Sequence, residues 1–237
     1  MFRYLWTMTL SIFLTGCLEF PHVFFHANAH QNIRTIAILP PKHIERVTIF
    51  YFLQAQDYLH MENALSSAAD FSLKMDIYNR SIFPAIFAPN AYFLSSLRRM
   101  LMMAGYHVII LPYRVRGEKF LSRYPRTIAD AFLDLRLGGV GYIANDEKSP
   151  YLPSSRLSAR LIEQPSNAIL YDSSFAVGNA SKLEQDIRYL GANTAYEYET
   201  FETLNSHALE SVDGLRGALD TLAQQIATDL QKTKKGK

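Results

Sequence analysis

The sequence predicts an α/β (α+β) fold, a mixed β-sheet with helices packed mainly on one face, in the order β-α-β-α-β-β-β-α. Three observations predict it. An amphipathic helix pattern runs directly into an apolar strand over residues 91–112, period-two segments flank residues 165–167, and apolar residues at helical spacing close the chain. Because 49% of the 237 residues are apolar, the chain can bury the core of a single α/β domain, which we assign to residues 33–230.

The domain begins with IRTIAILPP at residues 33–41, where apolar and β-branched residues before two prolines predict a buried strand. Residues 42–90 are less regular, and we expect an insertion or an elaborated first crossover near them. Inside this segment, VTIFYFL at residues 47–53 favours a strand, and apolar residues at helical spacing favour a helix over residues 62–75.

The next segments predict a helix, a tight turn and a strand. AYFLSSLRRMLMMAG, residues 91–105, gathers its apolar residues on one face and ends on a glycine suited to a C-cap. YHVIILP, residues 106–112, is a continuous apolar strand that ends in proline.

A second helix is predicted over RTIADAFLDLRL, residues 126–137, because a proline precedes it and two glycines follow it. Asp130 and Asp134 would then lie four residues apart beside Arg126. Paired carboxylates for catalysis are one interpretation, and a solvated helix face with an Arg–Asp pair is the favoured one.

Two strands and a final helix complete the predicted domain. Residues 155–164 alternate apolar and polar side chains, PSN at residues 165–167 is a turn, and residues 168–178 supply the partner strand, which together predict an antiparallel meander. Leucine and isoleucine at three-to-four spacing over LRGALDTLAQQIATDLQK predict a terminal helix that packs on the sheet.

The charge balance is close to neutral, with 24 Lys and Arg against 22 Asp and Glu. No strong asymmetry points to nucleic acid, and we expect none to bind. The basic tail at residues 231–237 is expected to be a solvated end.

LGGVGY, residues 137–142, has neither the G-x-G-x-x-G pattern nor a phosphate-loop lysine, so no nucleotide is expected. The glycines are expected to end a helix and to admit close backbone packing.

The first residues have the layout of a secretory signal. Arg3 precedes an apolar run over residues 4–14, which is shorter than the roughly 20 apolar residues that a membrane-spanning helix needs.

The four residues Leu14, Thr15, Gly16 and Cys17 resemble the bacterial lipobox. This resemblance implies a lipoprotein signal peptide over residues 1–16, cleavage before Cys17, and a diacylglycerol on the Cys17 thiol with further acylation, for example by palmitate. Several acyl chains on one residue give durable anchoring, at about 0.8 kcal/mol per buried methylene. Residues 17–32 would then be a lipidated tether that binds membrane lipid through Cys17.

An ordinary signal sequence is the competing interpretation. Ala27-Asn28-Ala29 resembles an A-x-A cleavage site, and a cut there would leave a soluble periplasmic protein. The lipobox is favoured because the apolar run ends at Cys17, which is also the only cysteine and can form no disulfide within the chain. By the sorting rule known for such lipoproteins, Leu18 after Cys17 implies the periplasmic side of the outer membrane, with the inner membrane as the alternative.

Three stretches together resemble a group of proteobacterial envelope lipoproteins. They are IAILPP, residues 36–41, ADAFLDLRLGGVGY, residues 129–142, and the segment from YLPSSR to FAVG, residues 151–178. The layout is also similar to the TolB amino-terminal domain and to the related domain of curli-secretion lipoproteins. The resemblance covers about half of the mature chain. Its members support envelope assembly, transport or secretion by binding other proteins, which implies an envelope protein partner here.

The sequence contains no recognisable catalytic constellation. A G-x-S-x-G elbow is absent, and Cys17 is assigned to lipid. His22, His26 and His30 are spaced by four and would suit a metal only on a helix, but their segment lacks a helical pattern. We therefore expect no cofactor, no metal and no enzymatic activity.

The most distinctive predicted loop is YLPSSR, residues 151–156. Its side chains Tyr151, Ser154, Ser155 and Arg156 could bind a glycan or a peptide strand, and a plain connector is the alternative.

The sequence thus predicts a lipid-anchored outer-membrane lipoprotein that binds another envelope component and supports assembly, transport or secretion. The alternative is an envelope hydrolase, or a glycan-modifying or glycan-binding protein, whose site is assembled from residues distant in the sequence. A weaker third option is an oligomeric secretion or pore component.

Overall fold

The structure is a computed structural model that describes residues 22–26, 32–52, 61–113, 117, 119–179 and 186–231, with the side chains of residues 61–66 left out. The lipobox, Cys17, the Ala27-Asn28-Ala29 motif, His30 and residues 232–237 lie outside the described residues.

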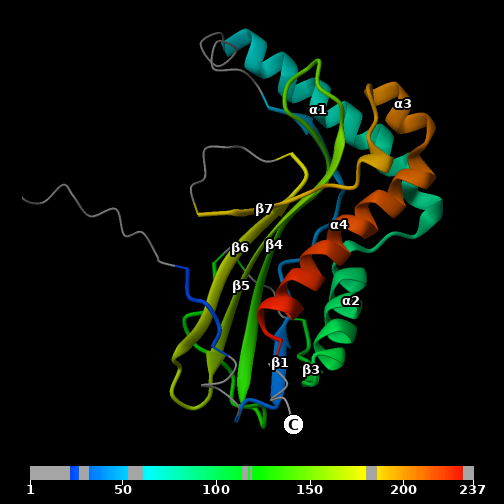
Figure 1. The fold of residues 1–237 in the computed structure, drawn as a ribbon. Helices are drawn as coiled ribbons and strands as arrows, with labels where there is room; N and C mark the ends of the chain where they lie inside the picture. Colours follow the sequence, from blue (N-terminus) through cyan, green and yellow to red (C-terminus); the bar gives the residue numbers. More distant parts are fainter. Residues whose placement is uncertain are drawn as a thin grey trace, which may run out of the picture.

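A mixed sheet forms the centre of the molecule, in the strand order β3-β1-β4-β5-β6-β7, with β2 also pairing with β4 (Figure 1). Strand β1 is parallel to both β3 and β4, and β2 is parallel to β4. Strand β5 is antiparallel to both β4 and β6, and β7 is parallel to β6. The bounds are β1 Thr35–Leu39, β2 Thr48–Tyr51, β3 His107–Ile110, β4 Ala131–Ala144, β5 Leu152–Glu163, β6 Ile169–Val177 and β7 Arg188–Leu190.

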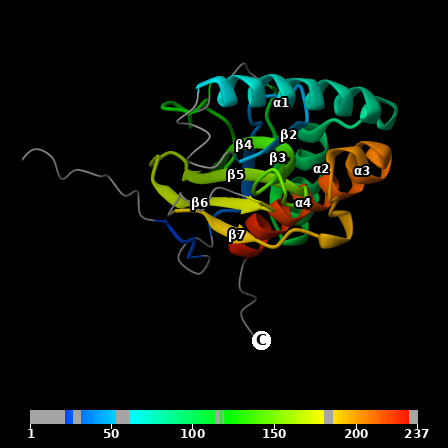
Figure 2. The ribbon, with the colours of Figure 1, turned by 90° about the horizontal axis from the view of Figure 1, so that it is seen from above.

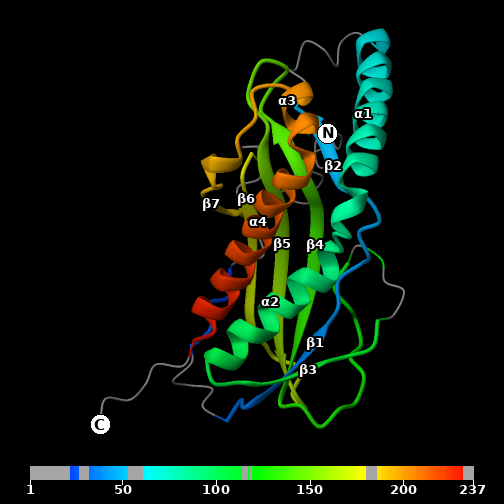
Figure 3. The same cartoon turned by 90° about the vertical axis from the view of Figure 1, so that its right-hand side faces the viewer.

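The helices lie together on one side of the sheet, which confirms the predicted fold class (Figures 2 and 3). Helices α2 and α4 contact each other, and α4 also packs on β5 and β6. The bounds are α1 Met61–Ile82, α2 Pro89–Met103, α3 Phe201–Ser206 and α4 Ala208–Asp229, with short 3-10 turns η2 Phe83–Ala85 and η3 Thr194–Tyr196. None of the described helices is both long enough and apolar enough to cross a bilayer.

The main core fills the space between the helices and the sheet. In β5, Leu157, Ala159 and Leu161 are buried on the helix side, as the period-two pattern predicts. In α4, the apolar residues at helical spacing are fully buried, namely Leu215, Leu219, Leu222 and Ile226. Complete burial of each such side chain contributes about 1.5–3 kcal/mol.

The second helix predicted from the sequence is wrong. Residues 131–137 belong to the long strand β4, which pairs with β1 on one edge and with β5 on the other. Leu133 and Leu135 face the helices, whereas Phe132 and Asp134 point to the opposite side. The apolar residues of this stretch fit a helical face as well as a strand, and pairing with two neighbouring strands decides between them.

Residues 42–90 contribute to the same sheet and core as the rest of the domain. They contain β2 and α1, so the strand expected over residues 47–53 and the helix expected over residues 62–75 are both present. Tyr78 of α1 is completely buried in the main core.

Residues 22–26, the described part of the expected tether, lie along the outer edge of β6. Val23 and Asp172 each donate their backbone N–H to the other's carbonyl, at 3.1 and 2.9 Å. Phe25 packs against the main core. The edge pairing and the Phe25 contact hold this segment, and neither requires a regular pattern in its sequence.

Candidate functional site

The side of the sheet opposite the helices carries a cleft of about 830 Å³. Arg136 of β4, Arg156 and Ser158 of β5, and Ser174 of β6 line its floor, while residues 42–46 and residues 186–187 line its two sides. We call this cavity the open-face cleft. It is the principal candidate site because it brings polar side chains from distant parts of the chain to one surface.

The wall at residues 42–46 exists because β1 and β2 pair with the same edge of β4. Strand β1 pairs with residues 131–134 and β2 pairs with residues 141–144, so the chain between them runs past the middle of β4. Pro40 and Pro41 end β1 there, since proline has no N–H to continue the strand ladder.

Two buried or half-buried asparagines hold this wall in place. The Asn90 side chain accepts the N–H of Ile44 at 2.8 Å and donates to the carbonyl of Lys42 at 2.9 Å. Asn79 makes the same pair of bonds with the N–H and carbonyl of Val47, at 2.9 and 2.8 Å. An amide supplies both a donor and an acceptor, so each asparagine replaces the strand partner that this segment lacks.

Glycines let β4 change partners beside the cleft. The pairing register of β4 with β5 shifts between Leu137 and Val140, which marks a bulge at the two glycines between them. At Gly141, a Cβ would lie 1.8 Å from the Thr48 carbonyl oxygen, so Thr48 can pair with β4 here because residue 141 has no side chain. The prediction of close backbone packing at these glycines is confirmed, but they do not end a helix.

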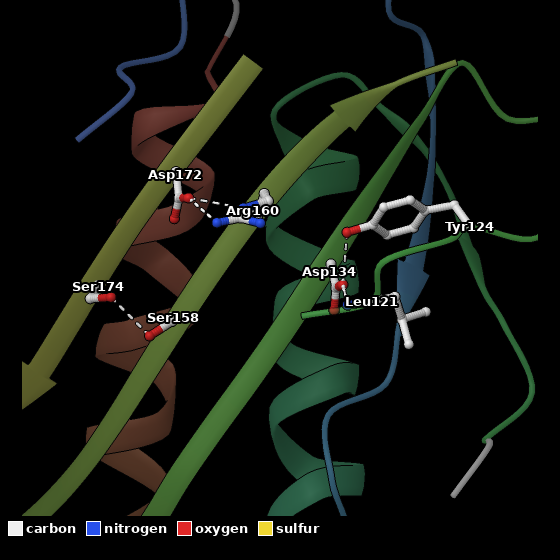
Figure 4. Close-up of polar contacts among 7 residues, drawn as sticks. All are labelled: Leu121, Tyr124, Asp134, Ser158, Arg160, Asp172 and Ser174. Carbon is white, nitrogen blue, oxygen red and sulfur yellow. Dashed lines mark hydrogen bonds and ion pairs between the residues drawn. The ribbon is translucent and has the colours of Figure 1, made fainter. Parts of the chain in front are cut away.

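A row of paired charges borders the cleft across β4, β5 and β6 (Figure 4). Arg160 donates two hydrogen bonds to one Asp172 carboxylate oxygen, at 2.6 and 2.9 Å. Asp134 is completely buried and accepts the Leu121 N–H at 2.9 Å and the Tyr124 hydroxyl at 3.1 Å. The charges of this row are therefore satisfied by protein groups, because the buried Asp134 and the half-buried Arg160 and Asp172 each have partners.

The next row, Arg136, Ser158 and Ser174, forms the floor of the cleft. Arg136 is opposite Ser158, and Ser158 is opposite Ser174, whose hydroxyl oxygens lie 2.8 Å apart (Figure 4). Arg156 points to the same side as Ser158 because it is two residues away on the same strand. The two serine hydroxyls thus bond each other, with guanidinium groups from two adjacent strands lining the same cleft.

Phe120 contacts one arginine from each row. Its ring centroid is 4.3 Å from the Arg160 guanidinium carbon and 5.2 Å from that of Arg136. Stacking of this kind restrains a flexible arginine side chain and leaves its N–H groups at the edge for other partners.

Basic groups outnumber acidic groups around the cleft. Lys42, Arg46, Arg136 and Arg156 line it together with His43, against Glu45 and Asp186. Arg46 is paired with Asp76 outside the cleft. The carboxylates come from the two side walls, so the floor itself carries a positive charge.

The structure brings one of the four residues predicted to form a binding loop into the cleft. The predicted loop is wrong, since β5 begins at Leu152 and Tyr151 already pairs with Tyr198. Ser154 and Ser155 are buried, whereas Arg156 lines the cleft. Because adjacent strand residues point to opposite faces, a strand cannot present all four side chains on one surface.

Metal-ligating side chains can be assessed only in the described part of the chain. Within the described residues, no group of three or more His, Cys, Asp and Glu is placed to hold a metal. His22 and His26 flank the Val23 bridge without forming a helix.

Sequence reasoning missed Arg136, Ser158 and Ser174, although the alternation of polar residues along each strand carried the signal.

Comparison with known proteins finds no matching family model and no matching curated protein. Among solved structures, the chain is similar to protein XCC0632 from Xanthomonas campestris, described under the family model DUF330, with a TM-score of 0.40 and 11% identity over 82% of each chain. It is also similar to PelC L103M from Paraburkholderia phytofirmans, a dodecamer, with a TM-score of 0.27 and 11% identity over 77% of this chain and 86% of that chain. Both sources are proteobacteria. Similarity at these scores supports no conclusion about function.

Proposed function

We propose that this chain is a lipid-anchored envelope protein whose α/β domain binds another envelope component in the open-face cleft. The observation that carries this proposal is the cleft itself, a cavity of about 830 Å³ on the sheet face that none of the described helices covers. Anchoring through Cys17 on the periplasmic side of the outer membrane, and a role in assembly, transport or secretion, complete the proposal.

The floor of the cleft is suited to recognition. Arginine presents a rigid fork of N–H donors, and both floor arginines are mounted on strands of a buried sheet. Ser158 and Ser174 bond each other rather than a histidine or carboxylate that could activate them as nucleophiles. This arrangement supports binding of a polar partner.

The position of residues 22–26 supports the lipobox over cleavage after Ala29. Such a cleavage would remove Val23 and Phe25, which pair with β6 and pack on the core. With Cys17 as the first residue, six residues lead to Val23, a reach of about 20 Å when fully extended. The β6 edge of the domain, and with it the cleft, would then stay close to the bilayer surface.

A photo-crosslinking amino acid placed in the cleft tests this function in native envelopes. We expect position 174 to capture a discrete envelope component, whereas Arg98, on the exposed side of α2, serves as the matched control position. Ser158→Trp should block capture at position 174 by filling the cleft. Equal labelling from positions 174 and 98, or capture that Ser158→Trp leaves unchanged, would contradict the proposed function.

The anchor is tested separately by Cys17→Ala. The variant should lose globomycin-sensitive processing and membrane association. Mass spectrometry of the wild-type amino terminus should find an acylated Cys17, and an unmodified His30 would instead show cleavage after Ala29.

The hydrolase or glycan-binding alternative has one observation in its favour, because Glu45 and Asp186 line the cleft from opposite walls. Glycoside hydrolysis uses two carboxyl groups that flank the scissile bond. Release of soluble fragments from purified envelope glycan, lost in both Glu45→Gln and Asp186→Asn, would support this alternative.

A further inference from the structure

We propose that the open-face cleft binds a phosphate group, with the Arg136 and Arg156 guanidinium groups as the main ligands and the Ser158 and Ser174 hydroxyls completing the site. This inference rests on the proposed function, since it names the ligand chemistry of the same cleft.

Strand geometry places the two arginines together. Arg136 pairs with Ser158, and Arg156 lies two residues before Ser158 on β5 and on the same face of the sheet. Diagonal neighbours of this kind across two antiparallel strands have their Cβ atoms about 7 Å apart. Two long side chains from this separation can converge on one tetrahedral anion.

The protein restrains Arg136 and leaves space for Arg156 before any ligand arrives. The Arg136 guanidinium carbon lies 5.2 Å from the Phe120 ring centroid. At Gly138, a Cβ would lie 3.1 Å from the Arg156 Cβ, so this glycine leaves room for the Arg156 stem. The contact with Phe120 reduces the side-chain entropy that Arg136 loses on binding.

The hydroxyl pair adds neutral hydrogen-bonding groups beside the arginines. Ser158 and Ser174 share one hydrogen bond of 2.8 Å, which leaves one of the two hydroxyl hydrogens to donate elsewhere. A phosphate has enough acceptor oxygens for two guanidinium forks and a hydroxyl at the same time.

The charge distribution favours a compact anion over an extended polyanion. The cationic floor is confined between Glu45 on one wall and Asp186 on the other. A long polyanion crossing the cleft would have to pass both carboxylates, which repel it. A single phosphate with a small organic group fits the volume of about 830 Å³, which is within the usual range of small-ligand sites.

The phosphate can belong to a soluble ester or to a phospholipid headgroup. Val23 bonds to Asp172, and Ser174 lies two residues further along β6. About eight extended residues therefore separate Cys17 from Ser174, six along the tether and two along β6. An anchor at Cys17 would keep the cleft within a few tens of ångströms of the headgroups. Phosphate is the shared chemistry, and the test below separates the two sources.

The direct test uses the processed full chain in a non-ionic detergent, titrated with glycerol phosphate by isothermal calorimetry. We expect saturable binding that weakens as salt rises, and at least about a tenfold loss of affinity in Arg136→Gln with Arg156→Gln. Arg98→Gln is the matched control and should bind as the wild type does. Absence of binding to both this ester and vesicles would overturn the inference, as would equal weakening by the control.

The vesicle arm identifies the source. A photo-crosslinker at position 174 should label phosphatidylglycerol in mixed vesicles with phosphatidylcholine if the headgroup is the ligand, and the double arginine variant should abolish this labelling. Binding of glycerol phosphate without lipid labelling assigns a soluble ester. Labelling or binding that the double variant leaves unchanged would overturn the site.

The same variants separate this inference from the proposed function. If position 174 captures its envelope component equally well in the wild type and in the double arginine variant, and neither phosphate probe binds, the cleft keeps its function and the phosphate inference falls. If position 174 captures nothing beyond the control position while the phosphate probes bind, the phosphate site stands and the proposed partner binding falls.

Discussion

Gly214 of α4 and Tyr142 of β4 meet so closely that a Cβ at position 214 would lie 2.4 Å from the Tyr142 hydroxyl oxygen. That hydroxyl donates a hydrogen bond of 2.9 Å to the Ser211 carbonyl, so the sheet and α4 are joined where glycine allows the approach. Burial raises the pKa of Tyr142, which keeps its hydroxyl protonated as the donor of this bond.

Two glycines of α4 should therefore respond oppositely to alanine. Gly214→Ala should destabilise the fold by roughly 1–3 kcal/mol, because the added methyl group overlaps Tyr142 and Tyr196. Gly217→Ala meets no atom within 4 Å and should stabilise it by about 0.5–1 kcal/mol through helix propensity. Urea unfolding measures both, and a stabilising Gly214→Ala would contradict the packing described.

Gly141 should be essential for the pairing of β2. A Cβ at Gly141 would lie 1.8 Å from the Thr48 carbonyl oxygen, whereas one at Gly139 would lie 3.4 Å from the Thr48 hydroxyl oxygen. Gly141→Ala should cost about 2 kcal/mol or more, with faster hydrogen exchange of the β2 amides and weaker binding in the cleft beside them. Gly139→Ala is the control for the β2 pairing, and equal changes in stability and in hydrogen exchange of the β2 amides in the two variants would count against this account.

Asp130 should stabilise the start of β1. Its carboxylate accepts the N–H groups of Arg34 and Thr35 at 2.8 and 2.7 Å. Asp130→Ala removes both bonds to a charged group and should destabilise the fold by about 2–3 kcal/mol, whereas Asp130→Asn keeps an acceptor and should cost less. Asp213→Ala, which removes only an exposed pair with Arg216, should change stability by less than about 0.5 kcal/mol.

Alkaline pH should destabilise the domain through its buried tyrosines. Burial raises the pKa of Tyr106 to about 12 from its ordinary 10, and burial also raises the pKa of Tyr171. Between the two pKa values, the folded state binds more protons than the unfolded state. The contribution of these tyrosines to the free energy of unfolding should therefore be complete below pH 10 and fall as pH rises towards 12. Unfolding curves across this range test it, and a flat profile would contradict protected tyrosines.

Tyr106→Phe should reduce that pH dependence. The variant also loses the hydrogen bond of 2.6 Å from the Tyr106 hydroxyl to the Leu230 carbonyl, so its stability at neutral pH should fall by about 1 kcal/mol. A lower stability with an unchanged alkaline slope would assign the slope to the other tyrosines.

Elements with a strong local pattern were predictable from the sequence. Helices α2 and α4 carry apolar residues at helical spacing, and β5 and β6 alternate around a Pro-Ser-Asn turn, so each could be identified without its neighbours. Residues 131–137 could not, because their apolar residues suit a helix or a strand until β1 and β5 pair with them. Of the predicted site residues, Arg156 reaches the cleft and Cys17 lies outside the described residues.

The sequence by itself determined the fold class, the helices α1, α2 and α4, and the β5–β6 hairpin, because these follow from spacing between nearby residues. Only the tertiary structure decided that Arg136, Arg156 and Ser174 share one cleft. Their meeting depends on the register of three strands, on a bulge at glycine, and on β2 rejoining β4 after β1 ends. The β5–β6 register follows from a local turn, whereas the pairing of β4 with β1 and β2 is set by contacts between residues far apart in the chain, which no local pattern encodes.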